Sequence, residues 1–220
     1  MWNELVEIFK GEDPLQGLAD QFMQLLGHAR SMIETVQPFV AGRTLDEATW
    51  QELLATDAKI NALEQGIRRG LVGHLSLKGA HALYCLKLMS LVKDGERLGE
   101  YAKNIAKVAQ NPAGAGAGGA TADRFDELEK LVLELFRETP RLVADQGDTA
   151  ALVAKGEQAE ALCDALGDAA LAGEGLSAAQ ASSTALLAFY YRRSVNHLLN
   201  ILSSVGGTVD DLDRHDERYC

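Results

Sequence analysis

The stretch LVKDGERLGEYAKNIA, residues 91–106, carries the clearest structural signal in the chain. Leu91, Leu98 and Ile105 recur every seven residues, which places them on one stripe of a helix. Most of the positions between them are polar, charged or small. This pattern predicts a long amphipathic helix, from about residue 79 to residue 110, that packs in a helical bundle.

Helix-favouring residues such as Ala, Leu, Glu, Gln and Lys dominate the rest of the chain, and strand patterns are nearly absent. Thr44 with Glu47, and Ser177 with Gln180, have the spacing of a capping box and are expected to start two of the helices. The chain is therefore predicted to be all-α. Five further helices are predicted, over residues 13–40, 44–78, 121–144, 148–171 and 177–205.

A glycine- and alanine-rich segment, NPAGAGAGG at residues 111–119, divides the chain almost at its midpoint. Such a composition predicts a flexible connection that does not pack. The halves on either side resemble each other, with three predicted helices each. A shift of 99 positions places Leu63 on Leu162. A shift of 96 positions aligns four identical residues of the third and sixth helices: Leu91 with Leu187, Arg97 with Arg193, Asn104 with Asn200, and Ile105 with Ile201.

Two amphipathic helices of any origin can be aligned this well, which is the alternative to a true repeat. We interpret the match as a repeat because both halves have the same helix count around a glycine-rich joint. The predicted fold is two tandem antiparallel three-helix bundles. The first occupies residues 1–110, a linker follows at 111–120, the second bundle covers 121–207, and an acidic tail ends the chain at 208–220.

The composition excludes several classes of function. Asp and Glu number 32 against 21 Lys and Arg, a formal charge of −11 that disfavours nucleic acid and anionic lipid as partners. No run of 18 apolar residues is present and the N-terminus lacks a secretory pattern, so a cytoplasmic protein is expected, reaching membranes only through partner proteins. Cys85, Cys163 and Cys220 form no CxxC pair, in keeping with a reducing compartment.

Residues 93–106 resemble the signature helix of the PhoU family, whose pattern reads approximately D-x-E-R-I-G-D-x-A-x-N-I-A. Glu100 stands where the family usually has Asp, and residues 57–64 are similar to the family's D-x-x-I-x-x-L-E entry. The matching positions are Asp94, Glu96, Arg97, Gly99, Ala102, Asn104, Ile105 and Ala106. The second half departs from the pattern: within residues 190–201 only Arg193, Asn200 and Ile201 survive.

The resemblance implies a cytoplasmic regulator of phosphate uptake and signalling. Such a protein acts as an adaptor on a phosphate transporter subunit, on a sensor histidine kinase, or on both, and homodimers are plausible for the family. An accessory role on a different phosphate transporter fits equally well. No G-x-S-x-G, P-loop or G-x-G-x-x-G motif is present, so no enzymatic activity is expected.

The resemblance also implies a metal site, because family members hold metal clusters on E-x-x-x-D pairs. Glu96 and Glu100 are four residues apart, which places two hard oxygen ligands side by side on one helical face. Asp94 and Glu64 add oxygens if the second and third helices are in register. These four residues are the candidate ligands for iron, zinc or manganese, and the alternative is a solvated acidic face supported by Arg97.

Other candidate sites are weaker. Asp57 and Asn61 have the same four-residue spacing as Glu96 and Glu100, but only one of them is a carboxylate. In the second half of the chain, Tyr190, Arg192 and Asn196 stand at the positions of Asp94, Glu96 and Glu100. A ferritin-like di-iron site needs Glu-x-x-His, and no histidine has Glu three residues before it. His74 and His81, seven apart and expected on one face, lack a third ligand.

The aromatic and basic cluster at residues 190–193 is either an interface hot spot or, as we favour, a core tyrosine beside arginines that reach solvent. Two alternatives to the adaptor stay open. One is a helical metal-binding protein, and the other is a purely structural bundle.

Overall fold

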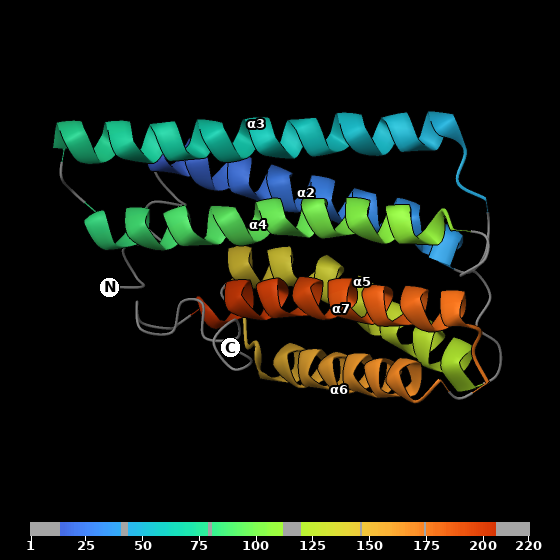
Figure 1. Cartoon of the computed structure of the whole chain (residues 1–220). Coiled ribbons are helices and arrows are strands. Elements are labelled where there is room, and N and C mark those ends of the chain that lie inside the picture. Colours follow the sequence, from blue (N-terminus) through green and yellow to red (C-terminus); the bar gives the residue numbers. More distant parts are fainter. Residues whose placement is uncertain are drawn as a thin grey trace.

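The computed structural model consists of two three-helix bundles that lie side by side (Figure 1). It describes residues 14–40, 44–78, 81–111, 120–145, 147–173 and 175–205. The first bundle contains α2 (Pro14–Val40), α3 (Glu47–Lys78) and α4 (Ala82–Ala109). The second contains α5 (Ala120–Asp145), α6 (Ala150–Ala172) and α7 (Ala178–Ser203). The predicted all-α fold of two tandem antiparallel bundles is confirmed.

The predicted linker and tail fall largely outside the described residues, at 112–119 and 206–220. No strand occurs in the part of the chain that the structure describes. None of the described helices combines the length and the apolar character that crossing a bilayer requires.

The helix ends follow local chemistry, with one correction. The capping box at Ser177 is confirmed: its hydroxyl oxygen accepts from the Gln180 backbone at 3.2 Å, and the Gln180 side chain accepts from the Ser177 backbone at 2.9 Å. The capping box predicted at Thr44 is wrong. α3 begins at Glu47, and Asp46 Oδ1 accepts the Thr49 backbone hydrogen bond at 2.7 Å, because a carboxylate one residue before the helix caps its N-terminal amides directly.

The heptad stripe of α4 faces the core of the first bundle, as expected from its spacing. Leu98 and Ile105 are fully buried and Leu91 nearly so. Two glycines on α4 allow its neighbours to approach closely. A Cβ added at Gly95 would lie 2.5 Å from the Leu25 side chain on α2, and a Cβ added at Gly99 would lie 2.6 Å from the Ile60 side chain on α3. The signature stretch is therefore packed between both other helices of its bundle.

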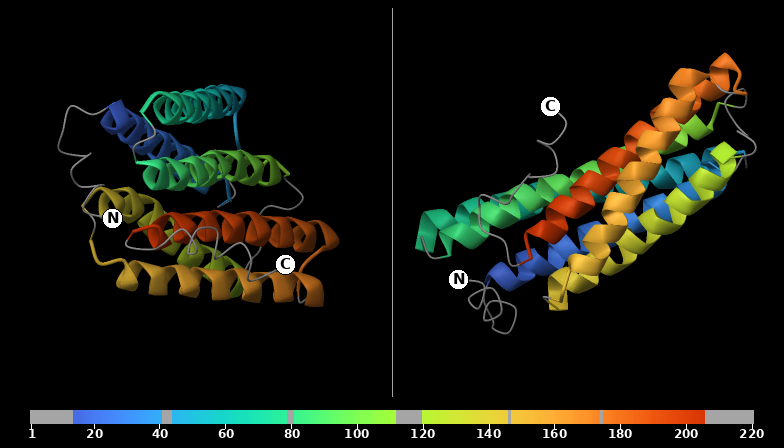
Figure 2. Two further views of the ribbon diagram at one scale, coloured as in Figure 1. Left: turned by 90° about the vertical axis from the view of Figure 1, so that its left-hand side faces the viewer. Right: turned by 90° about the horizontal axis from the view of Figure 1, so that it is seen from below.

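The two bundles meet along α4 with α7 and along α2 with α5, while α3 and α6 lie on the outside (Figures 1 and 2). α4 and α7 run antiparallel, since Asp94 pairs with His197 and Tyr101 lies against Tyr190. From residue 194 to residue 202 every side chain of α7 is buried. α7 is thus a central helix, and the joint between the bundles is a buried surface of the protein.

Candidate functional site

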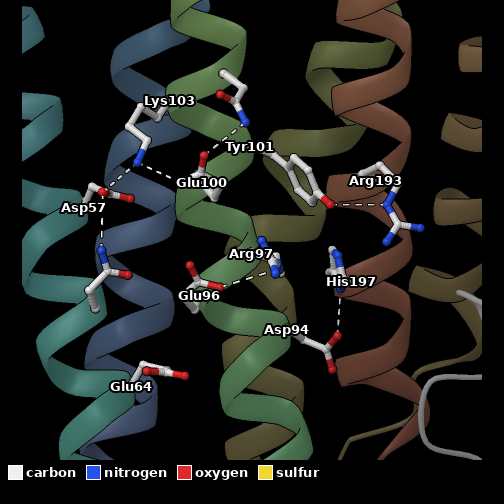
Figure 3. Close-up of polar contacts among 12 residues, drawn as sticks. Asp57, Glu64, Asp94, Glu96, Arg97, Glu100, Tyr101, Lys103, Arg193 and His197 are labelled. Atoms are coloured by element: carbon white, nitrogen blue, oxygen red, sulfur yellow. Dashed lines mark hydrogen bonds and ion pairs between the residues drawn. The ribbon is translucent and has the colours of Figure 1, made fainter.

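A group of carboxylates lines the contact between α3 and α4 (Figure 3). Asp57 and Glu64 come from α3, and Glu96 and Glu100 come from α4. Burial raises the pKa of Glu96, and the charges of Glu64, Glu100 and Asp57 raise it further against the opposing charge of Arg97. The structure therefore places three of the four predicted ligands, Glu64, Glu96 and Glu100, in one electrostatic neighbourhood and adds Asp57.

Lys103, which the sequence did not single out, lies between Asp57 and Glu100 at one end of this group (Figure 3). Its Nζ lies 2.8 Å from Asp57 Oδ2 and 2.7 Å from Glu100 Oε2, so one ammonium joins α3 to α4. Burial alone would lower the pKa of Lys103, but the hydrogen bonds and charges of the two carboxylates outweigh burial and raise it. Burial alone would raise the pKa of Glu100, and Lys103 with Asn104 lowers it instead.

The other two carboxylates have arginine partners on their own helices. Glu64 Oε1 lies 2.9 Å from Arg68 Nε, and Glu96 Oε2 lies 3.7 Å from Arg97 Nε. Both arginines are about two-fifths exposed, so these pairs are well screened by water. Each carboxylate of the cluster thus has a cationic side chain beside it.

Asp94, the fourth predicted ligand, faces the opposite direction. It is buried at the joint with α7, where its Oδ1 lies 2.7 Å from Nδ1 of His197. Tyr101 stacks on the imidazole with ring centroids 5.6 Å apart, and its hydroxyl accepts a hydrogen bond of 3.3 Å from Arg193 Nε. Asp94 therefore links the two bundles instead of joining Glu96 and Glu100.

The corresponding positions of the second bundle are filled differently. Arg192 on α7 pairs with Asp164 on α6. Asn196, with its amide oriented to donate, lies 2.9 Å from Glu160 Oε1. The loss of carboxylates predicted from residues 190–196 leaves a basic and an amide side chain, each bound to an acidic partner on the neighbouring helix.

For the aromatic and basic cluster at residues 190–193, the interpretation that we favoured was a core tyrosine beside arginines that reach solvent, and the tyrosine is found as expected. Tyr191 is buried, and its hydroxyl donates to Glu129 Oε1 at 3.0 Å. The arginines differ from expectation, because Arg192 and Arg193 are bound to Asp164 and Tyr101 and do not simply reach into solvent.

His74 and His81 do not share a helical face as expected. His74 lies near the end of α3, and His81 stands immediately before α4 in the left-handed backbone region, with φ of 58°. The centroids of the two rings lie 6.4 Å apart. Within the described residues, no group of three histidine, cysteine, aspartate or glutamate side chains is arranged to hold a metal ion.

The predicted ligands Glu64, Asp94, Glu96 and Glu100 accordingly do not form one donor set in this conformation. Asp94 is turned to the joint, and the other three have basic neighbours. The arrangement does not fit a metal ion without displacement of these side chains. Metal binding by these residues stays a prediction for direct measurement.

The PhoU domain family matches residues 22–109, which run from α2 to the end of α4 and include the carboxylate cluster. This segment of the chain is a PhoU domain. The matched region is the first bundle, and it contains the signature stretch.

Two solved structures share the fold over both bundles. One is the phosphate transport system regulatory protein PhoU from Streptococcus pneumoniae, with a TM-score of 0.74 and 17% identity over 87% of this chain and 92% of that one. The other is PhoU from Pseudomonas aeruginosa, with a TM-score of 0.72 and 17% identity over 87% of this chain and 95% of that one. No curated protein matches the sequence. At this identity the two structures establish the fold alone.

Proposed function

We propose that this PhoU-domain protein is a cytoplasmic regulator of phosphate transport that acts by binding a phosphate transporter subunit, a sensor histidine kinase, or both. The observation that carries the proposal is the PhoU domain at residues 22–109, within a fold shared with a phosphate transport system regulatory protein. The outer helices α3 and α6 offer broad, rigid surfaces for such partners. The protein reaches the membrane through its partner.

The regulator is proposed to act without catalysis. Among the described residues the two cysteines, Cys85 and Cys163, are buried. Burial raises the pKa of Cys163 to about 12, which leaves its thiol protonated and unreactive at neutral pH. Two of the described histidines are buried: His197 is engaged by Asp94 at the joint between the bundles, and the ring of His74 lies 6.4 Å from that of His81. The burial and contacts of these side chains favour roles in packing over roles in catalysis.

Co-purification with the transporter and kinase subunits of the host tests the adaptor function, together with phosphate uptake in cells that lack the protein. We expect at least one subunit to be retained and uptake to become insensitive to external phosphate in the deletion strain. Retention of neither subunit, with unchanged uptake, would contradict the proposal.

Two substitutions on exposed apolar side chains sharpen the measurement. Phe189 on α7 is 53% exposed and Leu171 at the end of α6 is 87% exposed, so serine at either position leaves the core intact. Loss of partner retention in one variant and not in the other would locate the binding face. Loss in neither would place it on another part of the surface.

The metal-binding alternative and the predicted homodimer are tested in one preparation. Metal analysis of the wild type beside Glu96→Ala/Glu100→Ala distinguishes a metal-free adaptor from a metal-binding protein. The mass in solution is recorded in the same experiment. Stoichiometric iron, zinc or manganese that is lost in the double variant would favour a metal-binding protein. A mass of about one chain would contradict the homodimer.

A further inference from the structure

We propose that the ammonium group of Lys103 is the built-in cation of the α3–α4 carboxylate cluster, so that this PhoU domain holds its second and third helices together without a metal ion. We propose further that removal of Lys103 uncovers a site for a hard divalent cation. Both statements concern the first bundle alone and are independent of which partner the regulator binds.

The first step is the repulsion within the cluster. Asp57 and Glu64 on α3 face Glu96 and Glu100 on α4 (Figure 3), and Asp57 Oδ2 and Glu100 Oε2 lie 2.8 Å and 2.7 Å from the same nitrogen atom. Like charges at this separation push the helices apart unless a cation lies between them. A positive group between Asp57 and Glu100 therefore stabilises the α3–α4 contact.

The second step is the identity of that group. Arg68 and Arg97 each pair with a carboxylate on their own helix, and neither bridges the contact. Of the ion pairs described in the cluster, only those of Lys103 span both helices. The Lys103 side chain is 14% exposed, so water screens its charge less than that of the exposed arginines Arg68 and Arg97.

The third step compares the second bundle. Shifts of 99 and 96 positions carry Asp57 to Gly156 and Lys103 to Leu199. Leu199 packs onto Gly156 so closely that a Cβ there would lie 2.5 Å from its Cδ2. The second bundle thus replaces the whole ion pair with an apolar contact. The second bundle lacks both the carboxylate that corresponds to Asp57 and the lysine that corresponds to Lys103. This is expected if Lys103 serves to neutralise Asp57 and Glu100.

The final step concerns what remains when the ammonium is removed. Asp57 Oδ2 and Glu100 Oε2 both lie within 2.8 Å of the Lys103 nitrogen, and Glu96 is close enough to be perturbed by both charges. Carboxylate oxygens from two helices around one position are the ligands that Mn²⁺, Mg²⁺ and Ca²⁺ prefer. Alanine at position 103 removes the side chain that fills this position and leaves the oxygens in place.

Melting temperature and Mn²⁺ binding measured by calorimetry test the proposal on the full chain. The wild type is expected to bind no stoichiometric Mn²⁺ at about 0.1–1 mM and to keep its melting temperature. Lys103→Ala is expected to melt about 4–8 °C lower without metal and to recover at least half of that loss with Mn²⁺. Lys103→Ala/Glu100→Gln should lose the recovery, because one bridging ligand is gone.

The matched control is Lys93→Ala, which removes the same charge at an exposed position of α4 and should leave both measurements unchanged. Lys103→Ala that folds only when Mn²⁺ is present would also support the proposal. Stoichiometric Mn²⁺ in the wild type that disappears in Glu100→Gln would overturn it, whether or not the alanine variant folds. A Lys103→Ala protein that melts like the wild type, or that ignores Mn²⁺, would overturn it as well.

Discussion

Glu129 is the residue whose substitution should respond most strongly to pH. It lies on α5, is 5% exposed, and accepts a hydrogen bond of 3.0 Å from the Tyr191 hydroxyl on α7. The side chain of Gln37, on α2, also donates to it. Burial raises the pKa of Glu129 from the ordinary 4.5 to about 7, and these two hydrogen bonds only partly oppose that effect.

The sign of the effect on stability follows from this pKa. The folded protein holds the Glu129 proton up to about pH 7, whereas the unfolded chain releases it near pH 4.5. Stability is therefore lost as the pH rises between those values, and above them the ionised carboxylate costs about 3 kcal/mol at about 1.4 kcal/mol per pH unit. Glutamine keeps the size and the hydrogen-bond acceptor but cannot ionise.

Urea unfolding of the wild type and Glu129→Gln at pH 5 and pH 8 measures this cost. We expect the free energy gained by the substitution to be about 2–3 kcal/mol larger at pH 8 than at pH 5. Glu127→Gln is the matched control, since Glu127 is exposed on the same helix and should show no such difference. An equal effect of Glu129→Gln at both pH values would refute the reasoning, because it would mean that burial does not penalise the charged form.

Three further predictions concern packing, capping and the joint. Ser177→Ala removes the capping box of α7 and should cost about 1 kcal/mol of unfolding free energy in urea titration. Gly95→Val should cost about 1–3 kcal/mol because its side chain would overlap α2, whereas Gly27→Ala, with no atom within 4 Å of the added Cβ, should be neutral or stabilising by the same measurement. Asp94→Ala should lower the free energy of unfolding by about 2 kcal/mol, because the His197 ring loses its buried partner. A loss below about 0.5 kcal/mol, the size of a weak neutral hydrogen bond, would show that the pair does not stabilise the joint.

The helical fold was predictable because its signal is periodic and local. The heptad spacing of Leu91, Leu98 and Ile105 and the capping pair at Ser177 both act within a few turns of one helix. The Thr44 pair satisfied the same rule and was still wrong, because Asp46 offers the first amides a stronger acceptor. Spacing identifies candidate caps but does not rank their chemistry.

The site was only partly predictable, because its contacts are distant in sequence. The pairing of Asp94 with His197 joins residues 103 positions apart, and nothing near either residue indicates it. The pairing of Lys103 with Glu100 was predictable in principle, since the two residues are three positions apart on one helix. Its second partner, Asp57, lies 46 positions earlier and appears only when α3 and α4 pack together. Carboxylate spacing alone therefore resembles a metal site whether or not a basic side chain fills it.

The antiparallel pairing of α4 with α7 and of α2 with α5 is the arrangement that two identical subunits form about a two-fold axis. Here a short peptide connection joins the halves, so each is confined near the other at an effective concentration in the millimolar range. A tethered interface needs less intrinsic affinity than one formed between free chains in dilute solution. Buried ionisable groups such as Asp94, His197 and Glu129, which would weaken association between free subunits, can be accommodated at the boundary between the halves.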